Sequence, residues 1–207
     1  ELMYSMPKGL TAATGMDALT HAIESYITPG AWVMSDMFEL KAIEMIAQNL
    51  KAAVDNGKDV AAREAMSQAQ YIAGMGFSNV GLGIVHSMAH PLGAFYDTPH
   101  GVANALLLPY VMEYNAESPA APKYIHIAKA MGVDTTGMSE AEGVKAAVEA
   151  VKALSASINI PQKLHEINVK EEDIPALAVA AFNDVCTGGN PRPTSVADIE
   201  ALYRKAF

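Results

Sequence analysis

The chain has 207 residues, of which 51% are hydrophobic and 18% are charged, and its formal net charge is −9 at pH 7. This length suits one well-buried domain, and the balance of apolar and charged residues excludes a disordered chain. The negative charge, with no basic cluster longer than Arg204 and Lys205, is unsuited to binding phosphate backbones, so we expect no nucleic-acid partner.

Hydrophobic residues recur three and four positions apart along most of the chain, a spacing typical of helices with one buried face. It predicts α-helices at residues 10–27, 33–54, 60–75 and 144–158. Breaker residues separate these segments at 28–30, 56–57, 119–122, 137, 161 and 187–193. Ser195 followed by Asp198 predicts a capping box that opens a last helix ending at Phe207. No sustained period-two alternation occurs, so we expect an all-α helical bundle forming one domain over residues 1–207.

No stretch of the chain is suited to crossing a membrane or to secretion. The longest apolar candidate, 102–112, is interrupted by Asn104 and Pro109 and is shorter than the roughly 20 residues that a bilayer requires. The first residues lack the segments of a signal peptide, and the single cysteine, Cys186, cannot form an intrachain disulfide. We therefore expect a cytoplasmic protein without membrane contact. Gly-x-Gly-x-x-Gly is also absent, so we expect no dinucleotide-binding βαβ unit here.

Four of the six histidines lie near one another or near a carboxylate along the chain. Asp17 and His21 are four residues apart on a predicted helix, so their side chains leave the same face and can converge on one ion. His86 and His90 repeat this spacing, and His100 follows at a point where a proline lets the chain turn back. We expect the helices that carry Asp17 and His86 to lie side by side.

A pair of this kind usually forms an ordinary hydrogen bond, so neither pair alone indicates a metal. The neighbours of His86 and His90 are small and apolar, however, and a buried imidazole needs a polar partner. Several histidines and a carboxylate inside an apolar helical domain most simply satisfy one another through a bound cation. His126 and His165 lack such surroundings, and we assign them to ordinary packing or to the surface.

Two long stretches around these residues resemble the signatures of the iron-containing (group III) alcohol dehydrogenases. The first is Ala-Ala-Thr-Gly-Met-Asp17-Ala-Leu-Thr-His21-Ala-Ile-Glu, and the second runs from Gly-Met-Gly-Phe77 through Gly-Ile-Val-His86-Ser-Met-Ala-His90-Pro to Thr-Pro-His100-Gly. The similarity extends through Asp184-Val-Cys186 to the end of the chain and is strongest to the branch that interconverts lactaldehyde and 1,2-propanediol. It implies the helical, metal-binding C-terminal domain that these enzymes share with dehydroquinate synthase.

By position, the resemblance assigns Asp17, His21, His86 and His100 as the four ligands of a catalytic metal, which is ferrous iron in the family. It places His90 beside both the metal and the nicotinamide, as a catalytic and cofactor-binding residue. His90 can relay a proton or orient the cofactor, and the sequence leaves both roles open. The ligand set also suits zinc, so Zn²⁺ can replace Fe²⁺ in isolated material.

Phe77 and Cys186 correspond to positions that line the substrate cleft in this branch of the family. Each also has an ordinary interpretation, because Phe77 can simply fill the core and Cys186 can be a small buried hydrophobe.

One departure from the family is large, because the N-terminal α/β domain with its glycine-rich phosphate loop is missing and the chain begins at Glu1. We expect a domain of a longer enzyme, inactive alone, whose other half holds most of the NAD(P). The implied reaction interconverts a small primary alcohol or diol and its aldehyde, and the implied full-length enzyme is a homo-oligomer. The metal would activate the alcohol or carbonyl oxygen for hydride transfer.

Two other classes of protein could use such residues. A helical metallohydrolase fits poorly, because the chain lacks an adjacent His-Asp pair and the Glu-x-x-His of di-iron bundles. A non-catalytic metal-binding domain would hold a coordinatively closed ion, whereas a dehydrogenase keeps one position open toward a cleft.

Overall fold

The computed structural model describes residues 3–207, so Glu1, on which the expectation of a longer enzyme partly rests, lies outside the described residues. Within this range the chain forms α-helices and short 3₁₀ helices and contains no strand, which confirms the all-α fold. The α-helices are α1 (Lys8–Ile27), α2 (Val33–Asp55), α3 (Val60–Val80), α4 (Ile84–Tyr96), α5 (His100–Asn115), α6 (Tyr124–Ala130), α7 (Glu140–Ser157), α8 (Ile174–Phe182) and α9 (Val196–Ala206). The 3₁₀ helices are η1 (Ala121–Lys123), η2 (Leu164–Ile167), η3 (Glu171–Asp173) and η4 (Val185–Gly189).

Local capping explains one end each of α3, α7 and α9. The capping box predicted at Ser195 and Asp198 is present at the start of α9. α7 begins four residues before the predicted position, because Ser139 and Glu142 form a second capping box. α3 continues past residue 75 to Val80 and stops at Gly81, whose φ of 85° an L side chain rarely adopts.

The segment that carries three of the histidines forms two helices joined by a tight turn. α4 contains Pro91 and α5 contains Pro109, and both helices continue through the proline, with most of their residues buried in the core. Asp97 ends α4 in the left-handed region with φ 52°, and Pro99 immediately precedes α5. His100 is therefore the first residue of α5, at a reversal of the chain.

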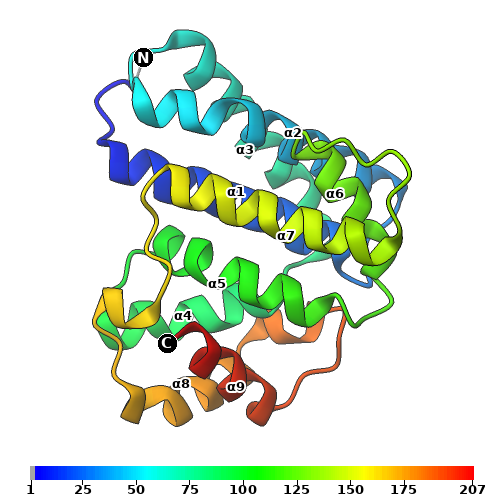
Figure 1. Cartoon of the computed structure of the whole chain (residues 1–207). Coiled ribbons are helices and arrows are strands. Elements are labelled where there is room, and N and C mark those ends of the chain that lie inside the picture. Colours follow the sequence, from blue (N-terminus) through cyan, green and yellow to red (C-terminus); the bar gives the residue numbers. More distant parts are fainter. Residues whose placement is uncertain (1–2) are drawn as a thin grey trace.

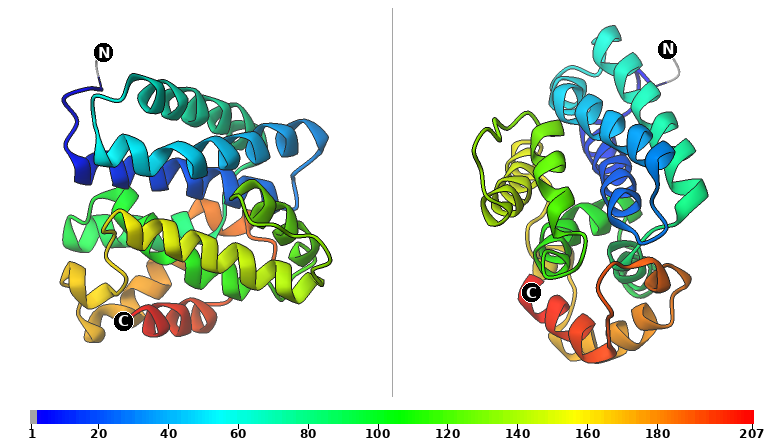
Figure 2. Two further views of the ribbon diagram at one scale, coloured as in Figure 1. Left: turned by 45° about the horizontal axis from the view of Figure 1, so that its top comes forward. Right: turned by 90° about the vertical axis from the view of Figure 1, so that its right-hand side faces the viewer.

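The helices surround α1, which supplies Met16, Leu19 and Ile23 to the centre of the core (Figure 1). α1 packs against α2, α3 and α5, and α4 packs against α5 and α8. Figure 2 shows α8 and α9 together at one end of the molecule and α2 with α3 at the other. The expected side-by-side arrangement of α1 and α4 is wrong. α5 packs against both of these helices, and α1 contacts α4 only at the start of α4.

Two glycines allow the helices to approach closely where the histidines meet. A Cβ at Gly101, in the first turn of α5, would collide with the carbonyl group of Ala13 on α1. A Cβ at Gly15 would collide with the side chain of Leu50 on α2. The backbone of α5 therefore starts directly against α1, one turn from Asp17.

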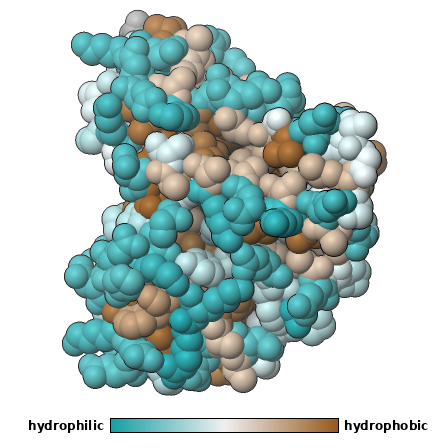
Figure 3. Space-filling model, viewed as in Figure 1, coloured by the Kyte–Doolittle hydropathy of each residue, from teal (hydrophilic) through white to brown (hydrophobic). Residues whose placement is uncertain are grey.

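The face over α7 is mixed in character, with hydrophobic residues gathered between α7 and the upper helices and hydrophilic residues around them (Figure 3). Among the described residues, no helix combines the length and the apolarity needed to cross a bilayer.

Candidate metal centre

Side chains from three helices converge where α1, α4 and α5 meet. Three atoms that could bind a metal lie within 4.8 Å of one another, one each from Asp17, His21 and His86. The Nε2 atom of His100 lies 3.5 Å from Oδ1 of Asp17, and the His86 and His100 rings are 5.3 Å apart at their centroids. The three-residue group is tighter than the set of four, and His100 lies at its open edge with 43% of its side chain exposed.

His21 and His86 are oriented by hydrogen bonds at Nδ1. Nδ1 of His21 donates to the backbone carbonyl of Asp17 at 2.8 Å, one turn earlier in α1. Nδ1 of His86 donates to Oε2 of Glu24 at 2.6 Å, and the other oxygen of Glu24 accepts the N–H of Val85 at 2.7 Å. In this tautomer each ring keeps its lone pair on Nε2, and Nε2 of His86 faces Oδ1 of Asp17 in the cluster.

Nε2 of His86 is a buried polar atom with no hydrogen-bond partner in the described structure. Its closest carboxylate oxygen is Oδ1 of Asp17, at 3.8 Å. That distance is too long for a hydrogen bond, and a buried acceptor without a partner costs free energy. A cation between these groups would satisfy it.

Asn104 holds the outer side of the cluster. Its Nδ2 donates to Oδ1 of Asp17 at 2.6 Å and lies 3.0 Å from Nε2 of His100. Asn104 is fully buried one turn after His100 on α5, so its side chain fixes the carboxylate of Asp17 from α5.

His90 lies beside the cluster, one turn after His86 on α4. Its ring stacks on that of His100 at 5.4 Å and 15°, and it lies 6.2 Å from the ring of His86. Its Nδ1 donates to Oδ2 of Asp184 at 2.7 Å, and 42% of its side chain is exposed. The structure thus brings His90 next to His86 and His100, with its Nε2 free of protein partners among the described residues.

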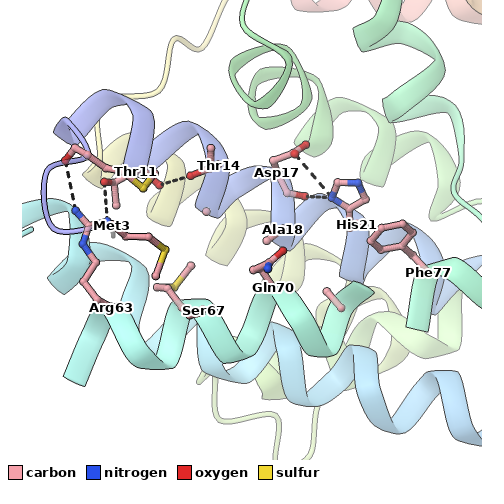
Figure 4. Close-up of a pocket in the computed structure, with 14 residues that line it drawn as sticks. Met3, Thr11, Thr14, Asp17, Ala18, His21, Arg63, Ser67, Gln70 and Phe77 are labelled. Atoms are coloured by element: carbon pink, nitrogen blue, oxygen red, sulfur yellow. Dashed lines mark hydrogen bonds and ion pairs between the residues drawn. The ribbon is translucent and has the colours of Figure 1, made fainter. Parts of the chain in front are cut away.

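Phe77 forms one wall of a cavity that opens from the cluster. Its ring stacks on His21 with centroids 4.5 Å apart. The cavity has a volume of about 410 Å³ and runs between α1 and α3, from Asp17 and His21 at one end to Arg63 at the other (Figure 4). Its walls include Met6, Thr11, Thr14, Met66, Ser67, Gln70 and Ala73.

Cys186 lies on η4 and does not line this cavity. Its N–H donates to Oδ1 of Asp184 at 2.9 Å. Burial, and then the negative charge of Asp184, raises the pKa of the Cys186 thiol to about 12. The side chain is therefore a neutral thiol, which is a poor metal ligand at neutral pH.

Burial favours the neutral form of two imidazoles of the cluster, those of His21 and His100. Burial lowers the pKa of His21, and the nearby His86 lowers it further, against the opposing effect of Asp17. Burial likewise lowers the pKa of His100, again opposed by Asp17. Neutral imidazoles are the form that binds a metal ion.

Glu24 and Asp184 are the residues that the sequence analysis missed. Glu24 lies three residues after His21, on the same face of α1, and this spacing could have identified it. Asp184 lies 94 residues from His90, so local spacing gives no such signal. His126 and His165 lie outside the cluster, where they bond to Tyr26 and to the carbonyl of Phe207.

The sequence and the fold define the class of protein. The model of the Fe-containing alcohol dehydrogenase family, C-terminal, matches residues 11–207. The chain therefore belongs to the iron-containing alcohol dehydrogenase family and corresponds to its C-terminal part.

Individual relatives are similar over the whole chain. Lactaldehyde reductase of Escherichia coli (strain K12) is 59% identical over 207 residues, which are 100% of this chain and 53% of that protein. NAD-dependent methanol dehydrogenase of Bacillus methanolicus is 44% identical over 207 residues, which are 100% of this chain and 54% of that protein. A crystal structure of 1,3-propanediol oxidoreductase matches with a TM-score of 0.98 at 47% identity, covering 100% of this chain and 54% of that one. The chain thus spans about half the length of the curated relatives that it matches.

Proposed function

We propose that this chain is the metal-binding domain of an NAD(P)-dependent alcohol dehydrogenase that interconverts a small primary alcohol or diol and its aldehyde. The family and the 59% identity to a lactaldehyde reductase support this reaction class. In this proposal an α/β domain upstream supplies most of the cofactor site, and the complete enzyme is a homo-oligomer. The length of the relatives supports the missing domain, because the chain corresponds to only about half of them.

Asp17, His21, His86 and His100 hold a divalent ion in this proposal, Fe²⁺ in the native enzyme. The observation that carries the assignment is the buried, unpartnered Nε2 of His86, which faces a carboxylate and two further neutral imidazoles. Three neutral imidazoles and one carboxylate are a ligand set that suits iron or zinc. Zn²⁺ can therefore occupy the same site in isolated protein.

The partial exposure of the site supports a catalytic ion over a closed, non-catalytic one. The side chains of His90 and His100 are 42% and 43% exposed, so one side of the cluster faces solvent. A divalent ion bound here would lower the pKa of an alcohol and polarise the carbonyl of an aldehyde. The hydride chemistry itself belongs to the nicotinamide.

His90 and Phe77 are the residues of this chain that act beside the ion. Nδ1–H of His90 donates a hydrogen bond to Asp184. Nε2 of His90 is therefore the atom that can accept a proton from the substrate side or contact the cofactor. Phe77 covers His21 and excludes water from one wall of the cavity. Cys186 remains the second predicted lining residue of the substrate cleft, and its N–H bonds to the same Asp184 that accepts from His90.

Two measurements test the proposal. The 207-residue chain alone should bind one equivalent of Fe²⁺ or Zn²⁺ under anaerobic conditions and should not reduce NAD with 1,2-propanediol, because the nicotinamide lacks its anchor. The same chain joined to the upstream half of the Escherichia coli lactaldehyde reductase should gain NAD-dependent activity. Robust NADH formation by the chain alone would refute the division of labour, and failure of both forms to bind metal would refute the ligand assignment.

A further inference from the structure

The side chain of Glu24 is 2% exposed and lies between the C-terminal half of α1 and the first turn of α4. One carboxylate oxygen accepts the N–H of Val85 at 2.7 Å and the other accepts Nδ1–H of His86 at 2.6 Å. Each carboxylate oxygen therefore accepts one hydrogen bond, from donors on adjacent residues, one of which is a proposed metal ligand.

The backbone before α4 is shaped around this carboxylate. A Cβ at Gly83 would lie 2.9 Å from Oε1 of Glu24 and 3.2 Å from Oδ1 of Asn190, closer than ordinary contacts. Only glycine leaves the carboxylate in its place without displacing a neighbour. The favourable position of a negative charge at the start of a helix adds to the stability of this contact.

We propose that Glu24 is a positioning residue that fixes the tautomer of His86 and thereby makes its Nε2 a metal ligand. The inference rests on the proposed metal site. A carboxylate that accepts Nδ1–H holds the proton of the ring on Nδ1, orients the ring, and increases the basicity of Nε2. Without this acceptor the buried ring can carry its proton on Nε2, where the proton occupies the lone pair that a metal needs.

Glu24→Gln tests this role because it keeps the size of the side chain and changes only its bonding. A glutamine carbonyl can accept from one of the two donors, and its NH₂ group must then face the other. If NH₂ faces His86, Nδ1 becomes an acceptor and the ring proton moves to Nε2. If it faces Val85, two donors oppose each other.

The experiment compares three forms of the 207-residue chain: the unmodified chain, Glu24→Gln and Glu39→Gln. Glu39 is the matched control, because it is also a fully buried glutamate of the core but bonds to no histidine. Zn²⁺ affinity is measured by competition with a chromophoric chelator. The histidine tautomers of the metal-free proteins are read from imidazole ¹⁵N shifts.

We expect Glu24→Gln to weaken Zn²⁺ binding by about 10- to 100-fold, the usual effect of losing such a carboxylate partner, and to move the His86 proton from Nδ1 to Nε2. Glu39→Gln should bind Zn²⁺ as the unmodified chain does. If Glu24→Gln does not fold, Gly83→Ala displaces the same carboxylate and should weaken binding in the same direction.

Binding by Glu24→Gln within twofold of the unmodified chain, with the tautomer unchanged, would overturn the inference. So would a proton on Nε2 of His86 in the unmodified metal-free chain, a readout that needs no metal. Absence of Zn²⁺ binding by the unmodified chain would instead refute the proposed metal site, so the two failures are distinguishable.

Discussion

Replacement of Glu39 by glutamine would remove a buried, unpaired carboxyl group from the centre of the helical core. Glu39 lies on α2 with 0% exposure, and neither of its side-chain oxygens has a hydrogen-bond partner in the described structure. Ser25 is a neighbouring hydroxyl, but it donates to the backbone carbonyl of His21 at 2.5 Å. Gly76 makes room for the carboxyl, because a Cβ there would collide with Oε1.

Burial raises the pKa of Glu39 from 4.5 to about 8. A raised pKa in the folded state means that the stability is complete below pH 4.5 and is lost as the pH rises through about 8. Each pH unit in this interval is worth about 1.4 kcal/mol, so the loss approaches about 3 kcal/mol at pH 7 and at most about 5 kcal/mol above pH 8. Glutamine does not titrate and escapes this loss.

Urea unfolding of the unmodified chain and of Glu39→Gln at pH 5, 6, 7, 8 and 9 measures the effect. Burying the amide of the variant lowers its free energy of unfolding by an amount that does not depend on pH. The informative quantity is therefore how the difference in free energy of unfolding between the two proteins changes with pH. We expect the variant to gain stability relative to the unmodified chain as the pH rises from 5 to 8, and the difference to level off above pH 8. A difference that stays constant across this range would refute the assignment of a neutral, desolvated Glu39.

Three further predictions concern the metal cluster in the chain joined to an upstream half. His86→Ala and His100→Ala should each abolish turnover through loss of the metal, which metal analysis of the purified variants would detect. His90→Ala should retain stoichiometric metal while its rate falls by about 10²- to 10⁴-fold, the usual range for general acid–base groups, and unchanged turnover would remove His90 from the mechanism. Gly101→Ala should push α5 away from α1, lowering stability by about 1–3 kcal/mol and weakening metal binding, because the new methyl group collides with the carbonyl of Ala13. Gly74→Ala is its control, since a Cβ at Gly74 meets no atom within 4 Å, and equal metal binding by the two variants would contradict the role of Gly101.

Sequence reasoning could predict the features that depend on local spacing. The four-residue spacing of Asp17 and His21 places both on one face of α1, and the Ser195 capping box marks the start of α9. The start of α7 was misplaced because hydrophobic spacing marks where a buried face begins, whereas Ser139 begins the helix on an exposed turn. The cap of α7 therefore defines its start better than its apolar residues do.

Features that depend on tertiary approach had no signal in the sequence. The contact of Gly101 with Ala13 joins residues from different helices, and so does the bond between His90 and Asp184. The expected side-by-side arrangement of α1 and α4 was wrong for the same reason, because side chains of two helices can converge without the helices packing along each other. Glutamate is a residue type that is usually exposed, so nothing in the sequence indicates that Glu39 is buried by the packing of the helices.

The cluster has a gradient of exposure, from His86 at 1% to His100 with a side chain 43% exposed, and this gradient bears on how fast a metal exchanges. The side where His100 and His90 face solvent gives an ion a route to the buried imidazole, besides the cavity that opens from Asp17 and His21. His100 is also the first residue of its helix, next to a reversal of the chain, so its contact is the easiest to open. We therefore expect His100 to govern the rate at which a metal dissociates, and with it the susceptibility to chelators and to replacement of iron by zinc. We expect His86 to govern the affinity for the metal. A domain that docks over His90 and His100 would slow exchange without touching the innermost ligand.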